Sequence, residues 1–266
     1  MTRIEVPEYD LVGIRAANPG PFTLTGTNSW ILGRDPAWLV DPGPLLGGHV
    51  DELAVEIGGR GGLGGIALTH DHADHAAAVR ATRERFPEAP LAGARGDVNV
   101  LLADGSRFGP LEAIATPGHS PDHLAFLTRA PARERDGEVI FSGDAVLGEG
   151  SVFITPDPGA LASYLKALER LRQRELVLLC PGHGPLVRDT SAKLDEYISH
   201  RLERESRLSA ALDAGKRTVD ELLEDVWSDA PAALRPAAAA TLAAHLDKLA
   251  EEGRLPDGVE HPQINL

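Results

Sequence analysis

The stretch from Thr69 to His75 constrains this chain more than any other. Its letters are THDHADH, so three histidines and two aspartates fall within seven residues. A short apolar run, Ile66 to Thr69, precedes it and predicts a strand, and the alanine-rich run from Ala73 to Arg85 predicts a helix. The cluster therefore stands where a strand ends and a helix begins, the edge at which α/β folds build their sites.

The spacing within this stretch is typical of a metal site. His70 and His72 are two residues apart, so their rings can reach one point, and Asp74 and His75 can reach a second point close by. Neutral imidazole and carboxylate are standard ligands of zinc and its first-row neighbours. The alternatives are a polar loop with chance histidines and a helix N-terminus at which Asp74 acts only as a cap. The full His-x-His-x-Asp-His pattern after a strand favours metal binding.

Three further predicted strands each end in a small-residue turn that carries one candidate ligand. His119 follows the strand 111–116, Asp144 follows 138–142, and His183 follows 176–180. Glycine and proline in these turns let the backbone turn sharply, so that a side chain can point over the strand ends. With the central cluster, the sequence supplies seven candidate ligands in equivalent positions.

The remaining pattern predicts alternating strands and helices. Strands are expected at 11–17, 28–33, 37–41, 91–94 and 123–128, and helices at 49–57, 97–103 and 159–174. Asp41 closes its strand and is either a turn residue or a partner for a histidine ligand. Two accessory residues are weaker candidates: His123 could support the site or donate a proton, and His200 could lean over it as a proton donor. A plain strand position and a surface position are the respective alternatives.

Composition narrows the functional class. The net charge of −14 means that a nucleic-acid-binding face would have to be local. The single cysteine, Cys180, fits a reducing compartment, and no secretion signal and no apolar run of about 20 residues is visible. We therefore expect a cytoplasmic protein that does not cross a membrane; the sequence leaves a homodimer open.

The strand pattern stops near residue 190. Helices are expected at 191–214, 218–227 and 232–252, followed by a turn or wing at 254–258, which predicts a small winged-helix-like module. We therefore expect a catalytic domain over residues 1–190 and the module over 191–266. The module holds nine Lys and Arg against fifteen Asp and Glu, a net charge of −6. This charge favours a module that packs on the main domain or borders the substrate site over one that binds nucleic acid.

The ligand pattern resembles the metallo-β-lactamase superfamily in residue type, order and spacing. The matching segments are His70-x-His72-x-Asp74-His75, His119 in Pro-Gly-His, Asp144 in Ser-Gly-Asp and His183 in Pro-Gly-His-Gly. The resemblance implies an α/β fold, the αββα sandwich. Within the superfamily the chain is similar to the lactamase-beta-like group that includes a mitochondrial single-strand-specific endoribonuclease. That likeness rests on segments 26–28, 142–150, 197–201 and 249–253.

The resemblance also implies roles for the ligands. His70, His72 and His119 would hold one divalent metal, Asp74, His75 and His183 a second, and Asp144 would bridge them. Two such metals share a hydroxide that acts as the nucleophile, and Asp74 would orient it or take a proton. Zinc is the default, and manganese and iron suit the same ligands. The positive charge of the two metals would exceed the negative charge of Asp74, Asp144 and the hydroxide, so the site could attract an anionic substrate.

Several activities fit this site. We expect a metal-dependent hydrolase, with phosphodiester cleavage of single-stranded RNA narrowly ahead of hydrolysis of an acyl thioester, as in the glyoxalase-II type. β-Lactamase activity is disfavoured because Asp144 stands where one lactamase class has cysteine and where another lacks the bridging residue. A mononuclear iron dioxygenase is disfavoured because the second metal site is complete. A non-catalytic metal-binding regulator is the remaining alternative.

Overall fold

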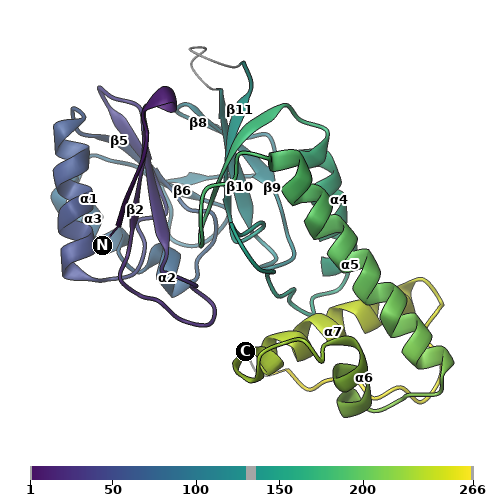
Figure 1. Cartoon of the computed structure of the whole chain (residues 1–266). Coiled ribbons are helices and arrows are strands. Elements are labelled where there is room, and N and C mark those ends of the chain that lie inside the picture. Colours follow the sequence, from purple (N-terminus) through teal and green to yellow (C-terminus); the bar gives the residue numbers. More distant parts are fainter. Residues whose placement is uncertain (1, 130–135, 265–266) are drawn as a thin grey trace. The chain divides into compact units, whose positions relative to one another are not determined.

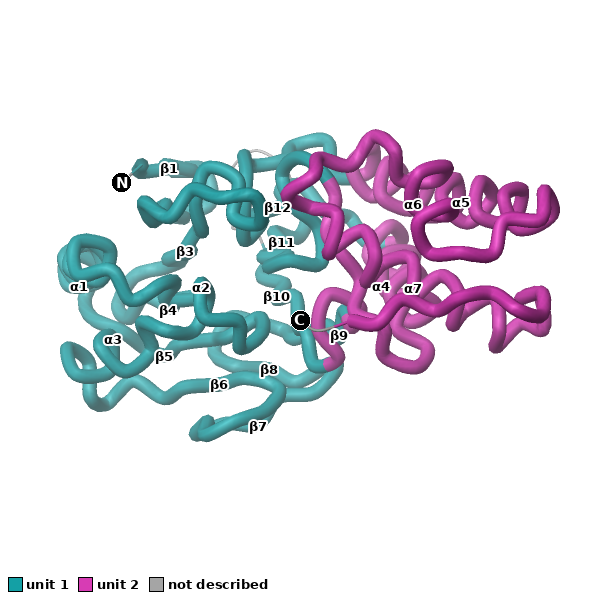
Figure 2. Tube along the Cα trace, turned by 90° about the horizontal axis from the view of Figure 1, so that it is seen from below, with its two compact units in different colours: residues 1–116, 122–150, 174–190 teal, residues 117–121, 151–173, 191–266 magenta. Residues whose placement is uncertain are grey.

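The computed structural model describes residues 2–129 and 136–264, and these fold into two compact units. Figure 1 gives the elements and Figure 2 colours the two units. The first unit comprises residues 1–116, 122–150 and 174–190, and the second comprises 117–121, 151–173 and 191–266. The boundary that the sequence predicts between residues 190 and 191 stays a prediction.

Within the described residues, the first unit contains two sheets. The larger has seven strands in sequence order. Its first four strands pair antiparallel, and the rest pair parallel. The strands are β1 (Thr2–Val6), β2 (Leu11–Arg15), β3 (Asn28–Leu32), β4 (Ala37–Val40), β5 (Leu63–Ala67), β6 (Leu91–Gly93) and β7 (Val100–Leu101).

The smaller sheet has five strands in the order β12-β11-β10-β9-β8. Its antiparallel strands are β8 (Arg107–Phe108), β9 (Leu111–Ala115), β10 (Leu124–Arg129) and β11 (Glu138–Gly143), and β12 (Leu176–Pro181) joins β11 in parallel. The predicted ligand turns that carry Asp144 and His183 therefore leave two adjacent parallel strands at the same end.

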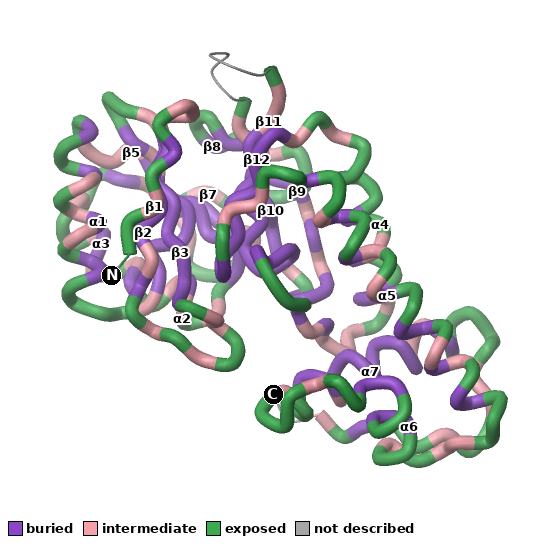
Figure 3. The backbone as a smooth tube through the Cα atoms, in the orientation of Figure 1, coloured by how far each residue is buried: buried purple, intermediate pink, exposed green. Residues whose placement is uncertain are grey.

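Alternation along the larger sheet divides its side chains between two cores. Trp30 and Val40 lie in a core with Phe126 and Phe141 of the smaller sheet, so this core is shared by the two sheets. Ile31 and Leu39, one residue away from these, lie instead in a core with residues of helix α1 (Gly47–Gly59). Figure 3 shows the strands as mostly buried. A period of two with both faces buried is expected for a sheet in an internal layer.

The helix predicted from Ala73 to Arg85 is wrong as a single element. It is two helices, α2 (Ala73–Ala76) and α3 (Val79–Arg85). The break has a tertiary cause, because the Ala78 N–H donates to the Gly43 carbonyl and the Gly43 N–H donates to the His75 carbonyl. These bonds take backbone groups that a continuous helix would pair internally.

Residues 97–103 form no helix, contrary to the sequence prediction. Val100 and Leu101 instead form β7 beside Ala92 and Gly93 of β6. So short a run fits the periodicity of a helix or of a strand, and pairing with the edge of β6 makes it a strand. The strands β1 and β8 also lie outside the predicted set.

The second unit is helical within the described residues. It contains α4 (Ala160–Arg172), α5 (Thr190–Asp213) after its first residue, α6 (Val219–Val226), a 3-10 turn (Ala232–Leu234) and α7 (Arg235–Glu251). Its core joins leucines of α5, α6 and α7 to Trp227. Thr218 and Glu221 form the capping box that begins α6. None of the described helices combines the length and apolar character needed to span a membrane.

Candidate metal centre

Four of the predicted ligands in the first unit converge on one point. His75 Nε2 lies 3.4 Å from Asp144 Oδ1, 3.5 Å from Asp74 Oδ2 and 3.3 Å from His183 Nε2. His183 Nε2 lies 3.1 Å from Asp74 Oδ2 and 3.3 Å from Asp144 Oδ2. The two imidazoles are fully buried, and the Asp74 side chain keeps 28% of its surface exposed. Asp74 is therefore the member of this group that can meet a substrate directly.

His70 extends this group, and His72 lies beside it. One ligand atom each of His70, His75 and Asp144 lie within 4.8 Å of one another. The His70 ring is 4.5 Å from the His72 ring and 4.3 Å from the His75 ring, measured between centroids. The turn between β5 and α2 thus directs its predicted ligands towards the turns that follow β11 and β12.

Asp41 fixes the orientation of this histidine cluster from behind. Its carboxylate accepts hydrogen bonds from His75 Nδ1 at 2.8 Å, Thr69 Oγ1 at 2.7 Å and the Thr69 N–H at 2.8 Å. Because the Thr69 hydroxyl donates to Asp41, its oxygen is free to accept from His70 Nδ1 at 3.0 Å. Both imidazoles therefore carry their proton on Nδ1, which leaves Nε2 as the ligand atom. Of the two roles that the sequence left open for Asp41, the structure shows the histidine partner.

The electrostatics of the cluster are those of a cation site. Burial alone would lower the pKa of His183 and of His75, but the charges of Asp144 and the neighbouring carboxylates raise it, to about 9 for His183. Burial opposes ionisation of Asp74 and Asp144, yet the two imidazoles lower both pKa values, to about 2 for Asp74. The carboxylates thus attract positive charge into the cluster, and metal binding would release the histidine protons.

Glycine permits the close approach of the ligand turns. A Cβ on Gly182 would lie 2.5 Å from Asp144 Oδ1 and 2.7 Å from His75 Cε1. Gly143, with φ of +49°, would place a Cβ 2.7 Å from Thr69 and 2.8 Å from His123 Nε2. A side chain at either position would push the donor atoms apart.

His123, predicted as an accessory residue, contacts the backbone of the Asp144 turn. Its Nε2 accepts a hydrogen bond from the Asp144 N–H at 3.0 Å, so the ring proton is on Nδ1, which donates to Thr116 Oγ1 at 2.8 Å. The ring is buried, and its centroid is 5.0 Å from that of His70. With both nitrogens so engaged, His123 acts on the site by holding Asp144.

Residues at the start of β3 also support the site, although no sequence pattern had assigned them a role there. The Thr27 hydroxyl accepts from Asn18 Nδ2 at 2.9 Å and directs its own hydrogen towards Asp74 Oδ2 at 3.3 Å. Asn28 donates through its side chain to the carbonyls of Pro181 and Gly184, 3.0 Å each, which flank His183. In the sequence, residues 26–28 (Gly-Thr-Asn) appeared only among the segments that carry the family resemblance. Their two adjacent polar side chains, next to buried positions, were the signal that could have pointed to a role in the site.

Two predicted residues belong to the second unit. The His119 ring lies in the turn between β9 and β10, with its centroid 4.7 Å from that of Phe153. Both ends of this short turn lie in the first unit, and its participation in the metal site remains a prediction. His200 Nε2 accepts from Arg204 Nε at 3.2 Å, and burial, reinforced by Arg201 and Arg204, lowers its pKa to about 4. This imidazole is therefore neutral at neutral pH.

The donor set in the first unit fits divalent metal ions. It offers buried imidazole Nε2 atoms, whose Nδ1 atoms are bonded outwards, together with two ionised carboxylates. Nitrogen and oxygen donors of this kind suit zinc, manganese and iron alike, so the residues do not select one metal.

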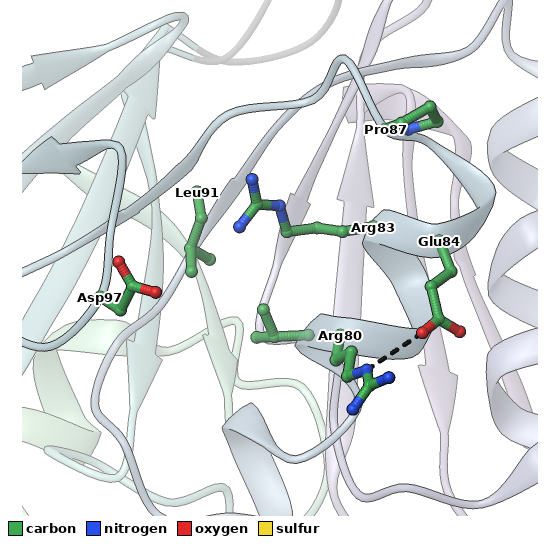
Figure 4. A pocket seen from close by; sticks show the side chains of 7 residues that line it. Arg80, Arg83, Glu84, Pro87, Leu91 and Asp97 are labelled. Atoms are coloured by element: carbon green, nitrogen blue, oxygen red, sulfur yellow. Dashed lines mark hydrogen bonds and ion pairs between the residues drawn. The ribbon is translucent and has the colours of Figure 1, made fainter.

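The first unit also has a surface pocket that lies apart from this cluster. It is an open pocket of about 520 Å³ beside α3, lined by Val79, Arg80, Arg83, Glu84, Pro87, Leu91 and Asp97 (Figure 4). Arg80 pairs with Glu84 at 3.1 Å within it. The lining contains none of the predicted ligands, so this pocket is not the proposed site.

Comparison with known proteins shows the family of the chain. Residues 88–183 match the sequence model of the metallo-beta-lactamase superfamily, and residues 218–256 match that of the beta-lactamase associated winged helix domain. A beta-lactamase-like protein 2 homolog from Caenorhabditis elegans is 30% identical over 256 residues, covering 89% of this chain and 82% of that protein. The chain belongs to the metallo-β-lactamase superfamily.

Two further relatives of this metallo-β-lactamase-fold protein are informative. An atrochrysone carboxyl ACP thioesterase from Aspergillus chevalieri is 30% identical over 241 residues, which cover 83% of this chain and 74% of that enzyme. The crystal structure of a beta-lactamase domain protein from Burkholderia ambifaria superimposes with a TM-score of 0.75 at 20% identity, covering 97% of this chain and 93% of that one. The predicted α/β fold with a C-terminal winged-helix module is confirmed, and the protein is a metallo-β-lactamase-fold hydrolase.

Proposed function

We propose that this hydrolase cleaves acyl thioesters at a dinuclear metal site. His70, His72 and His119 would hold one divalent metal, Asp74, His75 and His183 the second, and Asp144 would bridge the two. When bound, such ions acidify water and polarise the attacked carbonyl oxygen. Zinc is the default ion, with manganese and iron as alternatives that the same donors accept.

Asp41 and Asp74 have different roles in the proposed reaction. Asp41 holds His75 directly, and His70 through the Thr69 hydroxyl, in the tautomer whose Nε2 can bind. Asp74 is ionised at neutral pH and partly exposed, so it can take a proton from the attacking water. The water oxygen then bonds to the acyl carbon, the C–S bond breaks, and the thiolate leaves with the proton that Asp74 returns. The products are a carboxylic acid and a thiol.

We favour a thioester over RNA because the basic side chains of the C-terminal module are already paired with groups of the protein itself. Protein–RNA affinity depends on Lys and Arg that neutralise phosphates. In residues 191–264, six basic side chains pair with carboxylates of the same unit: Lys193, Arg204, Lys216, Arg235, Lys248 and Arg254. The other three donate to backbone carbonyls: Arg201, Arg207 and Arg217.

The name of the fungal relative supports the same choice. That enzyme is called an acyl-carrier-protein thioesterase, and its likeness extends over most of this chain. A thioester substrate needs one reacting carbonyl and no row of phosphate contacts, so it is compatible with a strongly acidic protein. For these two reasons we now place the thioester ahead of RNA, the reverse of the narrow preference in the sequence-based prediction.

Single-stranded RNA is the second candidate. It rests on the resemblance to the endoribonuclease-containing group. The attacking water would then add to phosphorus instead of an acyl carbon, and the same side chains would serve.

One set of assays separates these functions. The zinc-loaded protein is incubated in parallel with an acyl-pantetheine thioester, a fluorescent single-stranded RNA, a bis-aryl phosphodiester and a β-lactam. We expect thioester turnover, and its loss in Asp144→Ala and after chelation. RNA cleavage without thioester turnover would replace the first proposal with the second. Activity retained by Asp144→Ala would show that the site has been misassigned.

A further inference from the structure

Arg201 on α5 is buried in a way that demands an explanation. Its side chain is only 2% exposed, and its guanidinium donates to Ser151 Oγ at 2.9 Å and to the Val152 carbonyl. It also lies over the Tyr164 ring, 5.6 Å from the centroid. Among the residues that the structure describes it has no carboxylate partner. Burying a cation without an ion pair is costly, so a chain that keeps one there gains something from its geometry.

The turn that carries His119 rests on neighbours of Arg201. Gly118, with φ of +143°, packs so closely on Tyr164 that a Cβ would approach to 2.7 Å. The Gly118 carbonyl accepts from the Thr155 N–H at 2.8 Å and from its hydroxyl at 3.0 Å. The His119 ring meets Phe153 at a centroid distance of 4.7 Å and an interplanar angle of 66°. Two supports therefore hold the turn: Tyr164 and the segment 152–155.

Arg201 touches both of these supports. Its guanidinium carbon lies over the Tyr164 ring, and one of its nitrogens donates to the carbonyl of Val152, the residue directly before Phe153. We propose that Arg201 is a positioning residue for His119, holding the imidazole that would complete the first metal position. This inference rests on the ligand assignment of the proposed function. It does not depend on which ester is cleaved.

Arginine is the residue type that this geometry requires. A planar guanidinium can lie on an aromatic ring while its edge donates two hydrogen bonds in the same plane, whereas an ammonium group has no flat face and a single charged atom. Arg201→Lys should therefore keep the charge and lose one of the two supports. Arg201→Met should lose both and keep the apolar volume of the stem.

Arg204, one turn later on α5, supplies a matched control. It is also buried, 7% exposed, and it lies 5.7 Å from the centroid of the Trp227 ring. Its N–H groups bind the Val226 carbonyl and, at 2.5 Å, Asp229. Like Arg201 it lies over an aromatic ring and binds a backbone carbonyl, but it also pairs with a carboxylate and it contacts α6 instead of the neighbours of the His119 turn. A purely structural role would make Arg201→Met and Arg204→Met equivalent.

The test is metal binding by the full-length protein, because this readout needs no substrate. Metal-free wild type, Arg201→Met, Arg201→Lys and Arg204→Met are titrated with Zn²⁺ by calorimetry and with Co²⁺ by visible absorption, and urea unfolding is measured for each. For Arg201→Met we expect one of the two ions to bind about 10- to 100-fold more weakly, the range found for residues that orient metal ligands, with the other unchanged. Arg201→Lys should recover part of this loss.

Arg204→Met should lower stability and leave both ions bound as in wild type. Equal weakening in both methionine variants, or none in Arg201→Met, would overturn the proposal. Phe153→Leu removes the ring beside His119 without touching Arg201 and is used if Arg201→Met does not fold; it should weaken the same ion, and unchanged binding would refute the inference. Selective loss of one ion in a protein without thioester turnover would refute the proposed substrate and leave this inference standing.

Discussion

Replacement of Asp41 by asparagine tests the reasoning about the site most directly. Asp41 has φ of +54°, a conformation that asparagine also tolerates, so the substitution changes the side-chain chemistry with little backbone strain. The carboxylate accepts three hydrogen bonds, two from Thr69 and one from His75. An amide has only one oxygen. Whichever way it is turned, its NH₂ group faces a donor.

The structure sets the expected size of the effect. If the amide NH₂ faces His75, the ring must move its proton to Nε2 and loses the ligand atom; if it faces the Thr69 N–H, that buried donor is left unsatisfied. A hydrogen bond to a charged group contributes about 1.5–3 kcal/mol, so the metal-free protein should lose roughly 2 kcal/mol of unfolding free energy. The affinity for the second metal should fall about 10- to 100-fold, which is about 1.4–2.8 kcal/mol.

Urea unfolding of the metal-free protein and calorimetric titration with Zn²⁺ measure the two quantities separately. Asp71→Asn is the matched control, because Asp71 lies in the same ligand turn but is half exposed and pairs with Arg95. An exposed pair contributes about 0–1 kcal/mol, so this variant should keep both metals. Wild-type metal affinity in Asp41→Asn would refute the view that Asp41 sets the histidine tautomer.

Three further predictions address other parts of the molecule. Gly182→Ala places a methyl group 2.5 Å from Asp144 Oδ1, and we expect at least a tenfold loss of turnover with near-normal folding by circular dichroism; normal turnover would contradict the proposed ligand geometry. His123→Gln keeps an acceptor for the Asp144 N–H at the place of Nε2 and should retain more activity than His123→Asn, which cannot reach; the reverse order in a turnover assay would exclude the backbone role. Burial lowers the pKa of His245 to about 3, so this ring is neutral when folded and takes up a proton on unfolding below about pH 6.5. Stability contributed by His245 is therefore present above pH 6.5 and lost as pH falls, by about 2 kcal/mol at pH 5; urea unfolding at pH 7 and 5 should show a smaller difference for His245→Leu, and an equal difference would refute the linkage.

The candidate ligands could be picked out from the sequence because the pattern that marks them is local. His119, Asp144 and His183 each follow a strand in a turn of small residues, and the other four candidates lie close together between residues 70 and 75. The capping box of α6 likewise lies within four consecutive positions. Short apolar runs bounded by turn residues likewise marked most strands. Local rules failed where a distant partner competed, as at Ala78, whose N–H is taken by Gly43, and in β7, whose residues pair with β6.

Local sequence patterns were enough to predict the candidate donor atoms and the fold class that brings strand ends together. The orientation of those donors depends on contacts that form only in the folded chain. Asp41 reaches Thr69 and His75 across 28 and 34 residues, and Asn28 reaches the His183 turn across more than 150. The orientation of an imidazole depends on which group its other nitrogen meets, and no local pattern specifies a partner so far away along the chain.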